Sequence, residues 1–510
     1  MTAMSLCFMF SAVSLVLLHS SSASRVIFMP FPITSQAYIH VQMARAMLDR
    51  GHQVWLVVPD IMVDKNVLNT TGISVIQFHT GYSIEDDIVD ELFLKSYLAE
   101  ESMPFSVLCE RYHVIAHNIL SNEKLFQQMK AVHADLFVFD DNGFIAKMFV
   151  VFPYRLEIPF ACVDFSFEPF DRRTAFSPAT VPAFRSELNQ HMTLPERLKN
   201  TLLFLFQLMY RPPWHYEDVV ARYAPEMPYV SLDRLVARAE LWLVHLDPVV
   251  FYPYPTLPNV KYIGSMAAAP PDPLESRFQS FMDNAKDGAV VVTFGSMVKN
   301  MPQNITDKLI SAFLKLRPLK VVFRFDVTSP DPEQIMTSSW LPQNALLAHR
   351  NCRVFVTHCG KSGVYQGVYH GVPMLGLPLF FDQHENAHIM QAKGFGTTRD
   401  IRKISDQELA DTIKHLIEDP HYKQNITKAS TLFRELNGVP VKSAAYWLDH
   451  VMKYGGDYMR SSGQEMPLYQ FLLLDVLGII GGTVVVLLML LICCLKYLCR
   501  RFCKTKFKRE

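Results

Sequence analysis

The sequence of 510 residues lacks an excess of either charge, because 49 Lys and Arg residues balance 49 Asp and Glu residues. A nucleic-acid-binding protein would show a basic excess, so the composition argues against that class. Charged residues make up only 19% of the chain and apolar residues 50%, which excludes intrinsic disorder. At about 150 residues per domain, the length predicts about three structural units.

Cysteine is also scarce in the main body of the chain. Of nine cysteines, one lies in an apolar leader and four lie in or beside an apolar segment near the C-terminus: Cys7, Cys493, Cys494, Cys499 and Cys503. The remaining four are Cys109, Cys162, Cys352 and Cys359. This number excludes a disulfide-stabilised scaffold, and the four include no CxxC pair that would indicate a metal site.

The first 24 residues contain no Lys, Arg, Asp or Glu and include an apolar run from Leu6 to Leu18. The small residues Ser22, Ala23 and Ser24 precede a strand-like run that begins at Val26. This pattern predicts a secretory signal peptide over residues 1–24, although the usual basic residues at its start are missing.

A second apolar segment, from Val476 to Leu495, contains 20 residues without a charge, and about 20 residues span the hydrocarbon core of a bilayer. The tail that follows, residues 496–510, carries seven basic residues and one acidic residue. Basic residues next to a span face the cytosol. The sequence therefore predicts a single-pass type I protein with a lumenal body, a transmembrane helix over 476–495 and a basic cytosolic tail.

The C-terminal tail and the N-glycosylation sequons indicate in which cellular compartment the protein resides. Lys506 and Lys508 lie five and three places from the end and resemble a dilysine retrieval signal, which predicts the endoplasmic reticulum membrane; a plain stop-transfer cluster is the alternative. N-glycosylation sequons at Asn69, Asn304 and Asn425 agree with a lumenal glycoprotein. Residues 201–210 form an apolar run too short to span, which we interpret as core rather than as a surface that contacts the membrane or an oily substrate.

From Val26 onward, short apolar runs alternate with helical stretches, a pattern typical of an α/β fold with a doubly wound parallel sheet. Strands are expected at 26–30, 53–59 and 135–139, and a helix over 35–50. After a proline-rich stretch the pattern restarts, with strands at 289–294, 320–325, 352–357 and 372–378 and helices at 361–370 and 383–393. The sequence thus predicts two Rossmann-like domains, 25–264 and 289–475, joined by a linker over 265–288. Ligands of such sheets bind beyond the carboxyl ends of the strands, which here means the cleft between the domains.

The stretch from Trp340 to Asn386 carries the densest set of functional side chains. A strand that ends at Thr357 runs into the turn His358-Cys-Gly-Lys-Ser-Gly363, which opens a helix. Free N–H groups and the helix dipole at such a turn bind anions such as a diphosphate. Trp340 offers a flat face for a base, and Asp382 and Gln383 offer paired hydrogen-bonding groups for sugar hydroxyls.

The order and spacing of these residues resemble the nucleotide-sugar signature of the UDP-glucuronosyltransferases. The resemblance extends over nearly the whole chain, including Gly295-Ser-Met-Val298, the Arg50-Gly-His52 turn, the segment from Tyr422 to Trp447 and the C-terminal span. It implies a GT-B fold, a UDP-sugar donor with no tightly bound cofactor, and an inverting, metal-independent reaction.

The resemblance also implies roles for individual residues in donor binding. Trp340 would stack on the uracil with Gln343 and Arg324 nearby, and Gln366 would meet the ribose. Asp382 and Gln383 would bind the transferred sugar. The diphosphate would be held by Ser296, His358, Gly360, Ser362 and Gly363.

Three departures from the family pattern lie in the same stretch. Cys359, Ser362 and Gln366 replace a glycine, an asparagine and a glutamate. An amide binds a hydroxyl without the assistance of a charge and therefore less strongly. We expect weaker donor affinity or an altered choice of donor.

A further departure concerns the acceptor. Counting back from the Arg50-Gly-His52 turn, the histidine that serves as the family's catalytic base falls at Gln36, whereas its partner aspartate is retained as Asp140. Glutamine cannot accept a proton near neutral pH. This predicts either a preference for amines, since they attack through a free lone pair, or slow turnover of all hydroxyl acceptors. His40, one helical turn along, is the alternative as a displaced base, although we expect an ordinary wall or surface residue there.

These observations predict the transfer of a hexosyl group, glucuronosyl or glucosyl, to a small lipophilic acceptor. An apolar acceptor pocket would be lined by Phe165, Phe167, Phe170 and Phe176. Two alternatives stay open: a sugar transferase that acts on a membrane lipid, and a non-catalytic relative that binds nucleotide sugars or accompanies an active subunit. The expected partners are the UDP-sugar, the acceptor and the bilayer, with no nucleic acid, and assembly as a homo- or hetero-oligomer is open.

Overall fold

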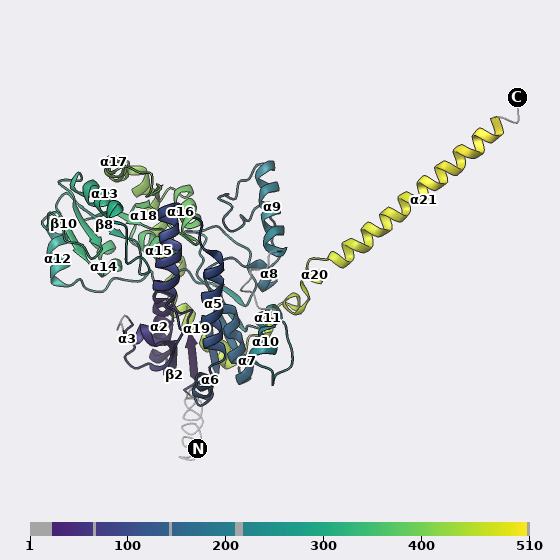
Figure 1. Cartoon of the computed structure of the whole chain (residues 1–510), viewed down its shortest axis with the longest axis horizontal. Helices are drawn as coiled ribbons and strands as arrows, with labels where there is room; N and C mark the ends of the chain where they lie inside the picture. Colours follow the sequence, from purple (N-terminus) through teal and green to yellow (C-terminus); the bar gives the residue numbers. More distant parts are fainter. Residues whose placement is uncertain (1–22, 65–67, 142–144, 210–217, 507–510) are drawn as a thin grey trace, which may run out of the picture.

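The computed structural model of the chain describes residues 23–64, 68–141, 145–209 and 218–506 (Figure 1). Two parallel sheets flanked by helices form the body, and one long helix leaves it (Figure 1). The predicted signal peptide lies outside the described residues apart from Ala23 and Ser24.

The first sheet contains seven parallel strands in the order β3-β2-β1-β4-β5-β6-β7. The strands are β1 (Arg25–Met29), β2 (Gln53–Pro59), β3 (Ser74–Phe78), β4 (Leu136–Asp140), β5 (Phe160–Asp164), β6 (Leu241–Val244) and β7 (Val260–Tyr262). All residues of β4, β5 and β6 are buried, because helices cover both faces of such a sheet. The strand order reverses between β1 and β4, and ligand sites of doubly wound sheets lie at this point.

The helices of the first half connect and cover these strands. They are α2 (Thr34–Asp49), α3 (Asp60–Asp64), the π-helix η1 (Ile84–Leu94), α4 (Lys95–Ala99), α5 (Phe105–Leu120), α6 (Glu123–Lys130), the 3₁₀ helix η2 (Ala146–Val150), α7 (Val151–Leu156), α8 (Pro169–Arg172), α9 (Leu194–Met209), α10 (Val219–Tyr223) and α11 (Leu232–Val236). In α2, Ala37, Val41 and Ala44 recur at helical spacing and are buried against the sheet. This packing brings the first turn of α2 to the carboxyl end of β1.

The second sheet contains six parallel strands in the order β10-β9-β8-β11-β12-β13. The strands are β8 (Ala289–Thr293), β9 (Lys320–Arg324), β10 (Ile335–Ser338), β11 (Cys352–Thr357), β12 (Met374–Gly376) and β13 (Gly396–Thr398). Its helices are α12 (Ser276–Asp283), α13 (Gln303–Leu314), α14 (Gln343–Ala348), α15 (Lys361–His370), α16 (Gln383–Ala392), α17 (Asp406–Glu418) and α18 (Pro420–Asn437). The α/β prediction is confirmed, and α12 lies inside the stretch expected to be a linker.

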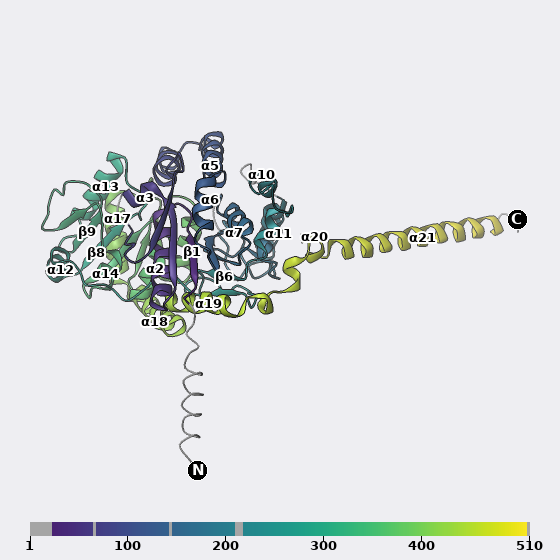
Figure 2. The same cartoon turned by 90° about the horizontal axis from the view of Figure 1, so that it is seen from below.

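After the second sheet the chain returns to the first half. The returning elements are α19 (Pro440–Tyr454), η3 (Asp457–Met459), η4 (Ser462–Glu465), α20 (Leu468–Phe471) and α21 (Leu474–Lys506). α19 packs against α2, where Asp449 pairs with Arg50 at 2.8 Å and with His52 at 3.2 Å. Figure 2 shows α19 running beneath the body from α18 toward α20. The closing helices are therefore divided between the halves, whereas the sequence analysis assigned all of them to 289–475.

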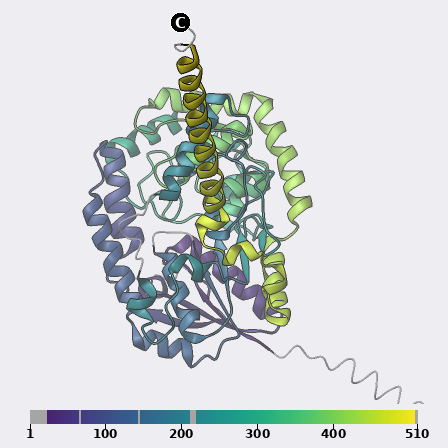
Figure 3. The same cartoon turned by 90° about the vertical axis from the view of Figure 1, so that its right-hand side faces the viewer.

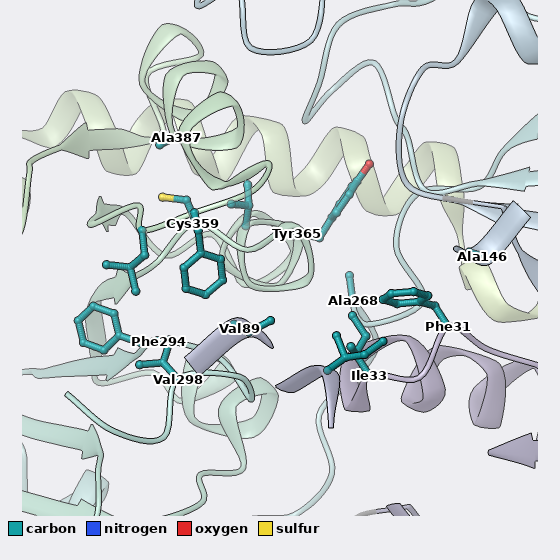
Figure 4. Close-up of a cluster of buried hydrophobic side chains, with 14 of the residues drawn as sticks. Phe31, Ile33, Val89, Ala146, Ala268, Phe294, Val298, Cys359, Tyr365 and Ala387 are labelled. Atoms are coloured by element: carbon teal, nitrogen blue, oxygen red, sulfur yellow. The ribbon is translucent and has the colours of Figure 1, made fainter. Parts of the chain in front are cut away.

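The two halves pack closely against each other. Figure 4 shows buried side chains from both, with Val89 from the first half beside Phe294 and Val298 from the second. Polar contacts also cross the cleft, and Asn300 donates a hydrogen bond to Asp90 over 2.9 Å. Apolar and polar contacts thus both join the two halves at the cleft.

Among the described residues, α9 and α21 each expose several large apolar side chains. α21 is long and apolar enough to cross a membrane, over Leu474–Arg500, in agreement with the predicted span. α9 contains most of the short apolar run 201–210, and several of its large apolar side chains face solvent. The interpretation of this run as core is therefore wrong for one face of α9, because only the opposite face packs on the body.

Candidate active site

The turn after β11 is shaped around the imidazole of His358. A Cβ atom on Gly295 would lie 2.6 Å from this ring, and one on Gly360 would lie 2.4 Å from it. Only glycine leaves room for the ring at these two positions. Cys359 adopts the left-handed conformation with φ 62° and is fully buried, a conformation that costs a residue with a side chain about 1–2 kcal/mol.

The electrostatics of His358 favour a neutral ring. Burial, together with the nearby charge of Arg324, lowers the pKa of His358 to about 4, while a hydrogen bond with the Thr293 backbone opposes the shift. Nδ1 of His358 is buried and has no hydrogen-bond partner among the described residues. The site thus holds a neutral imidazole with one unused ring nitrogen beside the N-terminus of α15.

Donor affinity is expected to rise as the pH is lowered. An anion next to His358 favours the protonated ring and raises the pKa that burial has lowered. Because binding raises this pKa, affinity should strengthen by about tenfold between about pH 8 and about pH 5. The measurement is the dissociation constant of UDP-glucose, whose diphosphate keeps its charge over this range.

The variant His358→Gln is the control for this pH dependence. Burial raises the pKa of Glu385 to about 7, and this group titrates in both proteins, so their difference isolates the imidazole. We expect the variant to lose most of the pH dependence. An affinity of the wild-type protein that does not change with pH would contradict the assignment.

The residues predicted to bind the uracil and the ribose lie in two contacting pairs. Trp340 is 55% exposed, and the guanidinium of Arg324 lies 5.4 Å from its ring centroid. Gln343 donates a hydrogen bond to Gln366 over 2.5 Å, and the Gln366 amide donates to the Ala267 carbonyl over 3.0 Å. A glutamate at position 366 could not donate this bond, so the departure from the family pattern ties α15 to the linker.

The predicted sugar-binding residues begin α16. Oε1 of Gln383 accepts hydrogen bonds from the backbone N–H groups of Leu379 and Phe380 over 2.8 and 3.1 Å. This leaves the Gln383 amide nitrogen, together with one oxygen of Asp382, for a sugar hydroxyl. The other Asp382 oxygen accepts from Asn386 over 2.8 Å. Asn386 also donates to the Cys359 carbonyl over 3.0 Å, which links the sugar and diphosphate positions.

The other residues predicted to hold the diphosphate lie close to the His358 turn. Ser296 follows β8 and Ser362 and Gly363 lie in the first turn of α15, all beside the His358 turn. Of the sequons, Asn69 and Asn304 are exposed and Asn425 is partly buried in α18. Asn69 lies in a loop, which is the more accessible setting for a glycan.

The acceptor side contains a buried histidine–carboxylate pair. Nε2 of His40 lies 3.0 Å from Oδ1 of Asp140, and both side chains are 0% exposed. The second Asp140 oxygen accepts a hydrogen bond from the Phe31 backbone over 2.5 Å. Nδ1 of His40 has no hydrogen-bond partner among the described residues. In the neutral tautomer that donates from Nε2–H of His40 to Asp140, Nδ1 carries no proton and can accept one.

Gln36 lies one helical turn before His40, at the start of α2. It is partly exposed, and its Oε1 is buried without a partner among the described residues. Asp140 therefore pairs with His40 and not with Gln36. The expectation of a surface position for His40 is wrong, because its side chain is fully buried against the carboxylate.

The four phenylalanines predicted to line an acceptor pocket divide into two groups. The Phe165 ring lies beside His245 at the carboxyl ends of β5 and β6, with ring centroids 4.6 Å apart and an interplanar angle of 39°. The other three, Phe167, Phe170 and Phe176, form a cluster with Phe204 of α9. Phe165 is thus the member of the set that lies beside the histidine at the cleft.

Two residues at the cleft were missed by the sequence analysis as functional candidates. Lys361, the first residue of α15, donates a hydrogen bond to the Phe165 carbonyl of the other half. His245 is buried, and its pKa is lowered to about 3 by burial and by the charge of Lys361. His245 directly follows the end of β6, and a polar residue at a strand end is a sequence signal for a ligand site. The contact of Lys361 with Phe165 could not be predicted from the sequence, because the two residues lie in different halves.

Comparisons with known proteins agree with this geometry. A family model described as UDP-glucoronosyl and UDP-glucosyl transferase matches residues 25–509. The chain is 31% identical over 495 residues to human UDP-glucuronosyltransferase 2B10, covering 91% of each chain. It is 29% identical to human UDP-glucuronosyltransferase 2B7, covering 93% of each.

Solved structures show the same fold. The glycotransferase of kitacinnamycin superposes with a TM-score of 0.59 at 18% identity, covering 84% of this chain and 99% of that one. The glycosyltransferase VinC in complex with DTDP gives a TM-score of 0.57 at 16% identity, covering 84% and 100%. These similarities confirm the predicted GT-B architecture.

Proposed function

The chain belongs to the UDP-glucuronosyl and UDP-glucosyl transferase family and is a UDP-glycosyltransferase, and we propose that it transfers a glucuronosyl or glucosyl group to small lipophilic acceptors. The names of the human relatives support glucuronate as one donor sugar. The alternative of a non-catalytic relative is not favoured, because the family match covers the whole body.

The proposed reaction is a single displacement without a metal ion. The acceptor oxygen attacks the anomeric carbon, the bond from that carbon to the diphosphate oxygen breaks, and UDP leaves with the configuration inverted. His358 and the N-terminus of α15 stabilise the charge that develops on the diphosphate. Asp382 and Gln383 orient the sugar through its hydroxyls.

The observation that carries the proposal on the acceptor side is the 3.0 Å contact between His40 and Asp140. We assign His40 as the base in place of Gln36, since Asp140 orients its ring and leaves Nδ1 free. The proton of a hydroxyl acceptor passes to this nitrogen as the oxygen attacks. Because Nδ1 of His40 is buried, the acceptor reaches it only when the side chains that cover it move aside.

The test is to incubate membranes containing the full-length protein with radiolabelled UDP-glucuronate, UDP-glucose and UDP-galactose, each with phenols, amines and a ceramide. We expect transfer from one or more of these donors to phenols. Transfer to ceramide alone would overturn the assignment of small acceptors. No transfer from any donor would overturn the proposed function.

We further propose that the protein resides in the endoplasmic reticulum membrane with its body in the lumen. α21 provides the span, and the basic tail, whose last four residues lie outside the described residues, provides the orientation signal.

Replacing Lys506 and Lys508 together by serine is expected to release the protein from the endoplasmic reticulum, because receptors read such signals through their side chains. The measurement is the sensitivity of its glycans to endoglycosidase H, which should be lost in the variant. A matched replacement of Lys496 and Lys504 by serine leaves the terminal spacing intact. If the Lys506 and Lys508 variant keeps its sensitivity, the retrieval signal is not there.

A further inference from the structure

Lys361 lies in the turn from His358 to Gly363, called the donor turn below, and directs its positive charge across the cleft. It follows Gly360, donates to the Phe165 carbonyl, and its Nζ lies 4.5 Å from the centroid of the Phe251 ring. Neither partner carries a charge. Among the described residues, Lys361 forms no ion pair. This partly buried ammonium therefore lacks a neutralising partner in contact with it.

The surroundings of Lys361 suit a negatively charged ligand. Burial lowers the pKa of Lys361, and the carboxylates of Asp382 and Glu385 nearby raise it. An ammonium has three donors, and the Phe165 carbonyl takes one of them. The buried Nε2 of His245, also without a partner among the described residues, lies on the opposite side of the cleft. A partly buried cation gains most from an ionised ligand.

We propose that Lys361 binds a negatively charged group of the donor, either the carboxylate of a UDP-hexuronate or the diphosphate itself. This inference rests on the proposed function, because it requires a UDP-sugar in the cleft. It makes Lys361 a residue that determines donor specificity or donor affinity, in addition to the predicted set.

The experiment compares Lys361→Met, which removes the charge, with Lys361→Arg, which keeps it, in the full-length protein. Lys393 supplies a matched control. It also joins the two halves, because it donates a hydrogen bond to the Pro248 carbonyl, and it also lies near an aromatic ring, that of Tyr252. For each protein the dissociation constants of UDP, UDP-glucose and UDP-glucuronate are measured by titration calorimetry.

The two sources of the anion give different results. If the carboxylate is bound, Lys361→Met weakens UDP-glucuronate about tenfold or more and leaves UDP and UDP-glucose unchanged. If the diphosphate is bound, all three ligands weaken together by a similar factor. In either case Lys361→Arg keeps most of the affinity and Lys393→Met leaves it unchanged.

The inference is overturned if no ligand weakens, or if Lys393→Met causes the same losses, since Lys361 would then only join the two halves. A wild-type protein that binds no UDP-sugar would instead contradict the proposed function.

A separate observation concerns the exposed face of α9. Six large apolar residues, between 46% and 73% exposed, recur at intervals of three or four along this helix: Leu194, Leu198, Leu202, Leu205, Phe206 and Met209. Such spacing places them in one stripe. The opposite face is fixed to the body, where Phe204 packs on Phe176 and Asn200 donates to the carbonyls of Pro178 and Val181. The stripe is therefore the outer face of a docked helix.

The position of α9 indicates what covers this stripe. α9 stands on the side of the body from which α21 leaves (Figure 1), and Figure 3 looks onto that side. Leu473 and Leu474 at the start of α21 are also exposed. A contiguous apolar face is rare on a water-exposed surface, and amphipathic helices lie at membrane surfaces with their apolar face inserted. We infer that the α9 stripe inserts into the surface of the bilayer that α21 crosses.

The test places a photoreactive diazirine residue at position 202, in place of Leu202, in the full-length protein reconstituted into phosphatidylcholine nanodiscs. The control carries the diazirine residue in place of Leu436, which is 61% exposed at the end of α18. Leu436 lies near the N-terminus of α19, whereas α20 and α21 follow the C-terminus of α19. Irradiation should yield phospholipid adducts at position 202 at least about fivefold more often than at position 436, because only the former lies in the bilayer. Equal yields, or cross-links from position 202 to a second copy of the chain, would overturn the inference.

Discussion

Replacing His40 by glutamine is expected to lower the turnover of phenols and alcohols by about 10²–10⁴-fold, the usual contribution of a positioned base. The glutamine amide can still donate to Asp140, so the buried carboxylate keeps a partner, but it cannot accept a proton. Amines attack through a free lone pair and should lose much less activity. The measurement is the turnover of a phenol and an amine with saturating donor.

Two further variants separate this role from packing. His40→Ala frees Asp140, and adding Gln36→His to it restores a histidine at the position where the family has its base. We expect this double variant to recover about 10²-fold of the lost phenol turnover, and the recovery should vanish when Asp140→Asn is added. Unchanged UDP affinity in each variant shows that the second half remains folded. Full phenol turnover by His40→Gln would show that His40 only fills space.

This expectation revises the preference for amines that Gln36 suggested. A wild-type protein without a base would turn over hydroxyl acceptors slowly, whereas one with His40 as the base would not. Fast phenol turnover in the wild type, lost in His40→Gln, supports the displaced base. Slow phenol turnover in the wild type, raised by Gln36→His alone, supports the sequence-based preference instead.

Removing His358 or Asp382 should lower turnover by at least about tenfold each, because one charge-assisted hydrogen bond contributes roughly 1.5–3 kcal/mol. His358→Ala removes a donor to the diphosphate, and Asp382→Ala removes an acceptor for the sugar hydroxyls. The measurement is kcat/KM for the donor at saturating acceptor, together with UDP affinity. UDP affinity should fall in His358→Ala and stay nearly unchanged in Asp382→Ala, since UDP carries no sugar for Asp382 to bind.

Asp406→Ala serves as the control for these two variants. Asp406 accepts hydrogen bonds from Ser311 and Lys315 over 2.5 and 2.6 Å, between α13 and α17. Its loss should affect stability but leave kcat/KM unchanged, because the residue lies outside the cleft. Unchanged donor affinity and turnover in both His358→Ala and Asp382→Ala would mean that the donor binds elsewhere.

Several elements could be predicted from the sequence with their bounds. β2 and β11 begin and end at the predicted residues, and α15 covers the predicted 361–370. Strands buried on both faces appear as continuous apolar runs, and these runs end at glycine or polar residues. The donor residues from Trp340 to Asn386 could be predicted as a group, because they are close in sequence and follow consecutive strand ends of one sheet.

The exposure of α9 could not be predicted in this way. An apolar run of this length is equally consistent with a buried helix and with a surface helix. Only the docking of α9 through Phe204 and Asn200 determined which face is covered. The return of α19 to the first half was hidden for a similar reason, since its apolar face does not specify which neighbour will bury it.

The sequence by itself thus determined the α/β class, the two halves, the apolar C-terminal helix and the donor turn, because each depends on residues close together in the chain. The tertiary structure alone decided that Asp140 pairs with His40, 100 positions away, and that Lys361 reaches Phe165 across the cleft. Such contacts depend on how two strands of a sheet and two halves of a fold are placed side by side. Local patterns of polarity carry no information about that placement, since the same pattern can be buried against many different neighbours.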